Sequence, residues 1–439
     1  MRVYKPSGIE WLEGGGGGKI PAHWEVRRLK YLFYISKEES RDEFPNVLSL
    51  TQNGIIERDI TTNKGQLAQN YIGYNIVKRG DIILNPMDLS SGYVAKSTFE
   101  GVISQAYIKI RPLETLNLSY YESFFQNLYH YKILWHLGKG ISYDHRWTLG
   151  NDVFLNIKIP LPPLQEQKEI AEFLDKKCEK IQNYINKKQK LITLLQEKKQ
   201  ALINEVVTKG LNPNIEFKNS GIEWLGEIPK HWEIKKLKYI GEIFGGVIGK
   251  TIKDFSKEYK PNFKPYITFT NVCNNAIINP NSMEYVFIDF DEKQNKVLKN
   301  DILFLQSSET FEDVGKNAIY LNDDEVYLNT FCKGFRIERE AYPMYLNYLL
   351  SSLSYKRYFM SVCSGFTRIN LRQEHFLDIP LILPPLQEQK EIAEFLDSKV
   401  AQINSAIEKT KKQIELVREY KNTLINEAVC GRIKLKEVK

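Results

Sequence analysis

The sequence contains no run of about eighteen consecutive apolar residues, the length that a transmembrane helix needs. Its 439 residues include only five cysteines, which are widely spaced and form no CysXXCys pair. Such cysteines are typical of reduced thiols and favour neither a disulfide framework nor a zinc site. The six histidines show no HisGluXXHis or similar ligand spacing. We therefore expect a soluble protein with no membrane span, disulfide or metal site.

Catalytic motifs are also scarce. The glycine run at 14–18 resembles a phosphate-binding loop, but its spacing is wrong and the required Ser or Thr is missing. AsnProMetAsp at 85–88 does not match the AsnProProTyr type of motif of amino-methyltransferases, and we expect a strand end and a turn there. Glu309, Asp313 and Lys316 form only a weak nuclease-like pattern. We interpret the chain as non-enzymatic, with no cofactor of its own.

The composition allows two globular domains and hints at a polyanionic partner. Hydrophobic residues make up 42% of the chain and aromatic residues 12%, enough for each half to bury a core. Lys and Arg total 61 against 54 Asp and Glu, a net charge of +7. This is a mild indication of nucleic-acid binding, since many proteins of similar charge bind none. The first residues do not resemble a signal peptide, so a cytoplasmic location is expected.

The most informative feature is an internal duplication. Fourteen residues at 162–175, beginning ProProLeuGlnGluGln, recur word for word at 384–397, 222 positions later. The other repeated blocks are SerGlyIleGluTrpLeu at 7–12 and 220–225, HisTrpGlu at 23–25 and 231–233, LeuLysTyr at 29–31 and 237–239, and LeuIleAsnGlu at 202–205 and 424–427. The chain therefore consists of two copies of one frame.

The inserts within the two frames have little sequence in common. They span about 33–153 and 241–375. A shared frame with different contents suggests one task performed twice on two different targets. The predicted regions are a first globular domain at 1–160, a helical region at 161–212, a second globular domain at 213–382 and a second helical region at 383–439.

Two long helices are predicted after the ProProLeu blocks. Residues 164–207 contain neither Pro nor Gly, and Gly210 and Pro213 end the run. The second copy extends from 386 to about 429. Apolar residues at alternating four- and three-residue spacing form a seam on each helix. In the first helix they are Ile170, Leu174, Ile181, Tyr184, Leu191, Leu195 and Leu202, and in the second Ile392, Leu396, Ile403, Ala406, Val417, Tyr420 and Leu424.

Neither helix would persist alone with such a seam exposed. Because each belongs to one half of a duplicated chain, we expect them to pair within the chain as an antiparallel coiled coil with pseudo-twofold symmetry. The alternative is that they dimerise with another copy. The repeated polar residues Gln165, Glu166, Gln167, Gln387, Glu388 and Gln389 are then predicted to be exposed. They form either an ordinary solvated face or a surface that docks two copies of one partner.

Both inserts read as α+β domains with the same plan. Strands are predicted at 80–84 and 106–110 in the first and at 300–304 in the second, followed by aromatic helices at 118–137 and 344–362. A loop of polar, aromatic and basic residues follows each helix. Arg and Lys can contact guanine or phosphate, and Asn can pair with adenine. The candidate DNA-binding residues are Lys139, Ser142, Tyr143, His145, Arg146, Thr367, Arg368, Asn370 and Arg372. Alternatively, these are solvated loops that cap the helices.

The repeated blocks resemble the specificity (S) subunits of type I restriction-modification systems. That family has a signature like IleProLeuProProLeuXGluGln followed by IleAlaXXLeu, seen here at 159–174 and, with an extra IleLeu, at 379–396. The familial GlyIleGluTrpLeuGlyXIleProXHisTrp is intact at 221–232, whereas the glycine run at 14–18 interrupts it in the first copy. The resemblance covers essentially the whole chain.

The resemblance implies an α+β protein with two target-recognition domains separated by two long helices. Family members bind double-stranded DNA, two methyltransferase (M) subunits and two restriction (R) subunits. Each recognition domain reads one half of a bipartite, asymmetric site, and the helices set the spacer and dock the M subunits. S-adenosylmethionine belongs to M, and ATP and Mg to R, so this chain itself would carry no cofactor.

Three other functions remain open at this point. A stand-alone DNA-binding protein would bind tightly without partners. A coiled-coil scaffold with no nucleic-acid role would tolerate neutralisation of Arg146, Arg368 and Arg372. An enzyme hidden in the inserts would show turnover alone.

Overall fold

The structure is a computed structural model, and it describes residues 3–13, 18–43, 45–60, 68, 70–89, 93–140, 147–365 and 368–433. The chain forms two compact units. Unit 1 comprises residues 1–188 and 411–439, and unit 2 comprises residues 189–410. Each unit thus contains one globular part and a portion of both long helices. Unit 1 has the start of the first helix and the end of the second, and unit 2 has the end of the first and the start of the second. The four regions expected in chain order stay a prediction.

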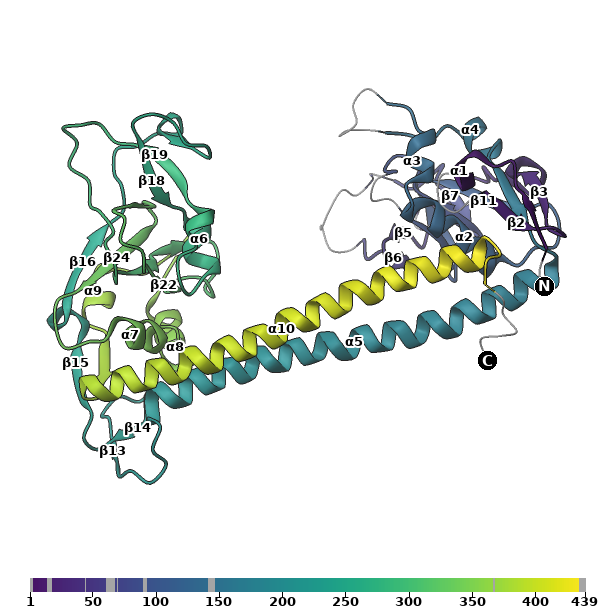
Figure 1. Cartoon of the computed structure of the whole chain (residues 1–439). Coiled ribbons are helices and arrows are strands. Elements are labelled where there is room, and N and C mark those ends of the chain that lie inside the picture. The colour runs from purple at the N-terminus through teal and green to yellow at the C-terminus, as the bar shows by residue number, and fades with distance from the viewer. Residues whose placement is uncertain are drawn as a thin grey trace. The chain divides into compact units, whose positions relative to one another are not determined.

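The two long helices have the predicted bounds to within a few residues. Helix α5 spans Leu164–Lys209 and α10 spans Leu386–Val429 (Figure 1). Glycine follows each helix closely and adopts a positive φ, +76° at Gly210 and +74° at Gly431. Only a residue without a Cβ takes this conformation at little cost, so glycine ends both helices.

Within each unit the two helices pack in antiparallel fashion. In unit 1 the first turns of α5, at Ile170 and Leu174, share a hydrophobic core with the last turns of α10, at Ile425 and Val429. In unit 2 the situation is reversed: Ile203 and Val207 near the end of α5 share a core with Ile392 and Leu396 near the start of α10. The predicted pairing within one chain is confirmed in each unit.

The seam differs in part from the prediction. Ile170, Leu174, Ile392 and Leu396 are buried, and Ile181, Leu195, Leu202, Ile403, Val417 and Leu424 are partly buried. The predicted seam is wrong at Tyr184 and Leu191. The side chains of these residues are each about 40% exposed, whereas those of Ile185 and Ile192, one position later, are buried. The error affects one of the two rows of the seam: this row passes through Cys178 after Leu174 and continues at Ile185 and Ile192, whereas Ile181, Leu195 and Leu202 of the other row keep their predicted places. In α10 the same shift buries Ile407 and Ile414 and leaves Tyr420 exposed.

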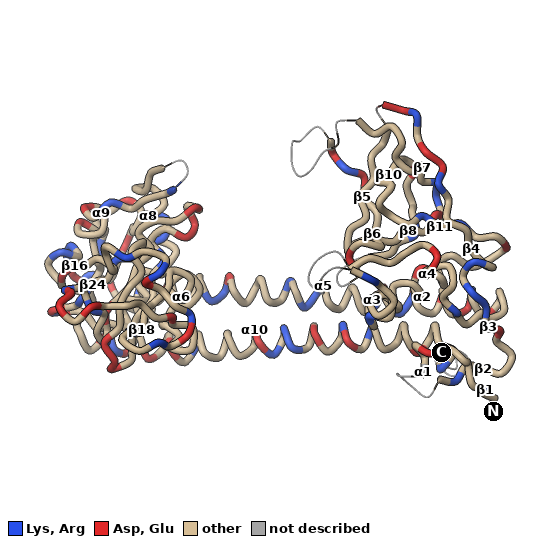
Figure 2. The backbone as a smooth tube through the Cα atoms, turned by 90° about the horizontal axis from the view of Figure 1, so that it is seen from above, with Lys and Arg blue, Asp and Glu red and all other residues tan. Residues whose placement is uncertain are grey.

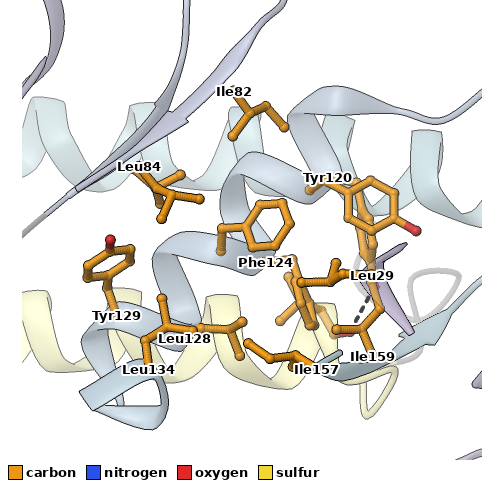
Figure 3. Close-up of a cluster of buried hydrophobic side chains, with 14 of the residues drawn as sticks. Leu29, Ile82, Leu84, Tyr120, Phe124, Leu128, Tyr129, Leu134, Ile157 and Ile159 are labelled. Carbon is orange, nitrogen blue, oxygen red and sulfur yellow. Dashed lines mark hydrogen bonds between the residues drawn. The ribbon is translucent and has the colours of Figure 1, made fainter. Parts of the chain in front are cut away.

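Unit 1 is built on a four-stranded antiparallel sheet with the order β4-β11-β8-β9. The strands are β4 (Phe33–Ile35), β8 (Ile82–Leu84), β9 (Val94–Lys96) and β11 (Ile108–Pro112). Helix α2 (Leu118–His130) carries Phe124 and Leu128 into the core beside Leu84 (Figure 3). The predicted strands at 80–84 and 106–110 are confirmed as β8 and β11.

The remaining elements of unit 1 are short. They are β1 (Tyr4–Pro6), α1 (Glu10–Glu13), β2 (Lys19–Pro21), β3 (Glu25–Arg28), the 3-10 turn η1 (Leu29–Tyr31), β5 (Leu48–Thr51), β6 (Gly54–Glu57), β7 (Asn75–Val77), β10 (Gly101–Ile103), α3 (Ile133–Leu137), α4 (Asn151–Leu155) and β12 (Lys158–Leu161). The strands pair as β1-β2, β3-β12, β5-β6 and β7-β10. The β3-β12 pair joins the beginning of the globular part to the strand that leads into α5.

Unit 2 repeats the main sheet with the order β16-β24-β20-β22. Its strands are β16 (Gly241–Gly245), β20 (Ile302–Leu305), β22 (Asn317–Ile319) and β24 (Cys332–Ile337). The other elements are β13 (Phe217–Asn219), β14 (Glu227–Pro229), β15 (Glu233–Lys236), η2 (Leu237–Tyr239), η3 (Ile252–Asp254), β17 (Phe255–Ser256), β18 (Phe263–Ile267), α6 (Phe269–Asn274), η4 (Pro280–Ser282), β19 (Glu284–Phe287), β21 (Ser307–Ser308), β23 (Tyr327–Leu328), α7 (Pro343–Leu350), α8 (Leu353–Val362), β25 (Ile369–Asn370), α9 (Gln373–Leu377) and β26 (Pro380–Leu383).

An ion pair between a partly exposed arginine and a buried aspartate underlies the main sheet of both units. Arg111 donates from Nε and Nη2 to the two carboxylate oxygens of Asp81, over 2.7 and 2.9 Å. Arg336 binds Asp301 in the same way, over 3.1 and 2.8 Å. Paired, hydrogen-bonded ions are the form in which charge is tolerated in a core. The prediction that both inserts share one plan is confirmed, although their sequences show little similarity.

Each predicted aromatic helix is in fact two helices. The first breaks between α2 and α3, where Lys132 has a left-handed φ of +58°. The second breaks at Ser351 and Ser352, between α7 and α8. Neither break contains Gly or Pro, so the sequence carried no ordinary signal for it.

Candidate nucleic-acid interface

The repeated motifs meet at a junction between each globular part and the helices. In unit 1 the buried Trp24 donates from Nε1 to Glu166 Oε2 over 3.1 Å, and His23 Nε2 bonds to the other carboxylate oxygen of Glu166. In unit 2 Trp232 donates to Glu388 Oε1 over 3.2 Å, and His231 Nε2 lies 2.8 Å from Glu388 Oε2. The Glu of GlnGluGln thus ties the first turn of each long helix to the HisTrp block.

The end of the other helix closes the same junction. A Cβ on Gly431, just after α10, would lie 2.7 Å from the ring of Trp24 in unit 1. A Cβ on Gly210, just after α5, would lie 3.3 Å from Trp232 in unit 2. Each tryptophan therefore packs between the start of one long helix and the end of the other, which explains why both blocks are retained in both copies.

The second glutamine of GlnGluGln is buried, contrary to the prediction of an exposed surface. Gln167 accepts a hydrogen bond from the backbone N–H of Asn117 over 2.9 Å and donates to the carbonyl of Pro162 over 2.9 Å. Gln389 accepts from the N–H of Tyr342 over 2.8 Å and donates to the carbonyl of Pro384 over 2.9 Å. Both side chains satisfy backbone groups that would otherwise be buried without partners, so they are unsuitable as docking residues.

The first glutamine of each motif is exposed. Gln165 donates to Glu169 over 3.1 Å, and Gln387 donates to Glu391 over 2.9 Å, one helical turn later in each case. Glu166 and Glu388 are partly exposed but are held by the junction. Of the six predicted docking residues, only Gln165 and Gln387 have side chains free of a role in the junction.

Each candidate DNA-reading loop is closed at its base by a pair of backbone hydrogen bonds. In unit 1 Lys139 and Thr148 exchange two backbone hydrogen bonds of 2.9 and 3.0 Å. In unit 2 Ser364 and Asn370 do so over 3.2 and 2.9 Å. Lys139, Arg368, Asn370 and Arg372 are exposed. The other candidates, Ser142, Tyr143, His145, Arg146 and Thr367, lie outside the described residues.

Each loop is anchored on the segment that follows a central strand of the main sheet. The N–H of Leu149 donates to the carbonyl of Pro86 over 2.9 Å, just after β8. The N–H of Leu371 donates to the carbonyl of Gln306 over 2.9 Å, just after β20, and β25 pairs with β21. The AsnProMetAsp segment is a strand end and turn, as predicted, with Asn85 Oδ1 accepting from the N–H groups of Met87 and Asp88.

The sequence did not predict these anchoring segments or Phe331 as parts of the candidate interface. The guanidinium of Arg368 lies over the ring of Phe331, 4.4 Å from its centroid. Arg372, in contrast, faces Glu374 at 3.5 Å. The matched strands 80–84 and 300–304 could have drawn attention to the residues after them, whereas nothing in the sequence places Phe331 next to Arg368.

Charge is mixed over both globular parts. Figure 2 shows Lys and Arg interspersed with Asp and Glu rather than gathered into one basic region. The net charge therefore does not by itself mark a DNA-binding face. The candidate interface is defined by the two anchored loops, whose exposed basic and amide side chains have the hydrogen-bonding groups that base edges require.

The residues considered for a hidden enzyme have the following environments. Burial raises the pKa of Cys273 and, to about 12, that of Cys430, so these thiols stay protonated and are weak nucleophiles at neutral pH. Asp313, part of the nuclease-like pattern, pairs with Lys316 at 2.5 Å. In the part of the chain that the structure describes, no cluster of three or more His, Cys, Asp or Glu side chains could bind a metal ion. No described helix combines the length and apolarity needed to cross a bilayer.

Two α+β domains share a common sheet, and each is completed by segments of two paired helices. They define a duplicated modular scaffold in which each module carries its own insert. The chain belongs to the family described as the type I restriction modification DNA specificity domain, which matches residues 21–196 and 229–416. The resemblance to S subunits noted from the repeated blocks is confirmed.

Individual relatives agree with the family. The MjaVIII specificity subunit of a type I restriction enzyme from Methanocaldococcus jannaschii is 27% identical over 459 residues, covering 100% of this chain and 99% of the relative. The EcoKI specificity subunit of Escherichia coli is 26% identical over 211 residues, covering 47% of this chain and 44% of the relative. A solved chain from work on complex assembly and conformational transition of the type I R-M system aligns with a TM-score of 0.71 at 16% identity, over 94% of this chain and 99% of that one. At this identity the solved chain shows a common fold.

Proposed function

We propose that this chain is the DNA-reading subunit of a type I restriction-modification complex, in which each globular domain recognises one half of a bipartite site. The observation that carries the proposal is the equivalent anchoring of two different loops. One loop is held by Leu149 and Pro86 and the other by Leu371 and Gln306, after corresponding strands of the two main sheets. A recognition scaffold that reads two sequences needs one frame and two sets of base-contacting residues.

The two half-sites should differ. The loop of unit 1 begins at Lys139 and that of unit 2 carries Arg368 and Asn370, so the hydrogen-bond donors and acceptors offered to base edges are not the same. Two unlike readers give an asymmetric target, in contrast to the palindromes read by symmetric dimers.

The paired helices are proposed to set the length of the spacer between the half-sites. With a rise of about 1.5 Å per residue, the 46 residues of α5 extend about 69 Å. To test this, seven residues are removed from both helices, 186–192 and 408–414, so that two turns are lost and the apolar seam keeps its phase. Since a base pair rises about 3.4 Å, the spacer should shorten by about three base pairs while both half-sites stay the same. An unchanged spacer would exclude the helices as the ruler.

Methyltransferase subunits are proposed to dock on the first turns of α5 and α10. Identical residues are exposed there in both copies and have no part in the junction: Gln165, Lys168, Glu169 and Glu172, and their repeats Gln387, Lys390, Glu391 and Glu394. Two equivalent surfaces suit two M subunits. M would supply S-adenosylmethionine and the methyl transfer, two R subunits would supply ATP- and Mg-dependent cleavage, and this chain would catalyse neither. The complex would act on DNA in the cytoplasm.

The decisive experiment is co-expression with the methyltransferase encoded beside this chain, followed by single-molecule mapping of methylated adenines in host DNA. The expected result is a split motif with two different half-sites and a fixed gap. If the methyltransferase partner is active and neither a complex nor new methylation appears, a stand-alone binder or a scaffold becomes the better explanation.

A further inference from the structure

Arg368 is the described candidate whose guanidinium is held by an aromatic ring. It lies over Phe331, 4.4 Å from the ring centroid. Among the described residues no carboxylate forms a salt bridge with Arg368, whereas Arg336 binds Asp301 and Arg372 faces Glu374. Stacking on an aromatic face restrains a guanidinium but leaves the N–H donors in its plane available to another molecule.

The ring and the loop share one anchor. The N–H of Gln306 donates to the carbonyl of Phe331 over 3.0 Å, and the carbonyl of Gln306 accepts from the N–H of Leu371 over 2.9 Å. The pairing of β25 with β21 and the Ser364–Asn370 bridge hold the backbone on either side. Arg368 is therefore fixed both at its backbone and at its guanidinium, so less conformational entropy is lost when it binds.

Unit 1 has no such ring at the equivalent position. The strand registers pair Leu84 with Ile108 in unit 1 and Phe304 with Lys333 in unit 2. Two residues before Lys333 stands Phe331, and two residues before Ile108 stands Ala106. The ring of Phe331 therefore has no counterpart at the equivalent described position of unit 1, as expected for a feature that contributes to specificity rather than to the shared frame.

We propose that Arg368 reads a guanine in the half-site recognised by the domain of unit 2, with Phe331 as its positioning residue. This inference rests on the proposed function. Guanine presents two adjacent acceptors, O6 and N7, in the major groove, and a restrained guanidinium can donate to both. A phosphate contact would need the charge but neither the fork nor the ring, so substitution by Lys separates the two roles.

The test compares methylated motifs made by the complete M–S complex carrying the wild-type chain, Arg368→Lys, Arg368→Gln, Phe331→Leu or Phe331→Tyr. Both Arg368 variants should lose discrimination at one G·C pair of one half-site by roughly five- to a hundred-fold. The other positions should be read as before. Phe331→Leu should weaken discrimination at the same pair, and Phe331→Tyr, which keeps the ring, should restore it.

Two exposed residues of unit 2 serve as matched controls. Arg339 lies beyond the opposite end of β24 from Phe331 and pairs with Glu338, and Phe290 is 99% exposed. Arg339→Gln and Phe290→Leu should leave the motif unchanged.

Several outcomes would overturn the inference. These are a wild-type motif without any G·C pair, full discrimination by Arg368→Lys, or a uniform loss of methylation across all sequences in Arg368→Gln, as expected for a phosphate contact. Failure of the proposed function itself would look different, because the wild-type chain would then give no split motif at all.

Discussion

The junctions and the loops of this chain differ in what the two units have in common. At the junctions, His23, Trp24 and Glu166 of unit 1 have identical counterparts in unit 2 that make the same contacts. In the loops, the backbone anchors correspond but the exposed side chains do not. The comparison teaches that repetition at the junctions accompanies buried contacts that both units need for folding, whereas the candidate DNA-reading loops share only their backbone anchors.

The largest expected effect concerns the tryptophans of the junctions. Trp24→Ala and Trp232→Ala each remove a fully buried ring and should lower the free energy of unfolding by about 3–5 kcal/mol. Urea denaturation monitored by circular dichroism measures this. As a control, Tyr239→Ala removes a repeated ring that is 62% exposed and should change the stability by about 0.5 kcal/mol or less. Similar effects in all three variants would contradict the distinction between junction and surface.

The seam of α5 gives the next largest effect and tests the corrected register. Ile192→Ala removes a side chain that is 4% exposed and should cost about 2–4 kcal/mol, while Leu191→Ala, at 39% exposure, should cost less than about 1 kcal/mol. The denaturant midpoints of the two single variants measure this difference in stability. If Leu191→Ala proved the more destabilising, the seam expected from the sequence would be right after all.

The smallest expected effect on stability is the difference between variants of the two glutamines of the repeated motif, Gln387 and Gln389. Gln389→Leu leaves the N–H of Tyr342 and the carbonyl of Pro384 without partners, at a cost of about 1–3 kcal/mol in unfolding free energy. Gln387→Leu should be nearly neutral for stability, because Gln387 is exposed.

Binding of the methyltransferase subunit should also distinguish Gln387 from Gln389. Under the proposed docking surface, Gln387→Leu together with Glu391→Ala should weaken assembly measured by size-exclusion chromatography, and Gln389→Met should not do so while the chain stays folded. The reverse pattern would move the docking surface away from the first turns of α10.

Much of this fold follows from the sequence because duplication supplies an internal comparison. The long helices lack Gly and Pro, and the strands at 80–84 and 300–304 are matched apolar segments, so both could be predicted. The predicted seam was wrong at Tyr184 and Leu191, because Cys178 is a weak apolar signal beside Lys177 and the buried positions of that row are Ile185 and Ile192, one residue later.

The candidate site was less predictable. Repetition of GlnGluGln predicts an exposed surface, either solvated or docking a partner, yet Gln167 and Gln389 are buried and bond to backbone groups contributed by distant segments. Such satisfaction of buried polar groups depends on the tertiary fold and leaves no local pattern. The same holds for the stack of Arg368 on Phe331, whose members are brought together by the β21-β25 pair.

The packing of Val429 and Cys430 against the core of unit 1 has a consequence for biosynthesis. These residues are buried, and the hydroxyl of Tyr120 donates to the carbonyl of Val429 over 3.0 Å. The core of unit 1 is therefore complete only after Val429 and Cys430, more than 250 residues downstream of β12, have been translated. At about 5–20 residues per second, the earlier part of unit 1 would spend tens of seconds with apolar surface uncovered, so nascent chains are expected to depend on chaperones until α10 has been synthesised.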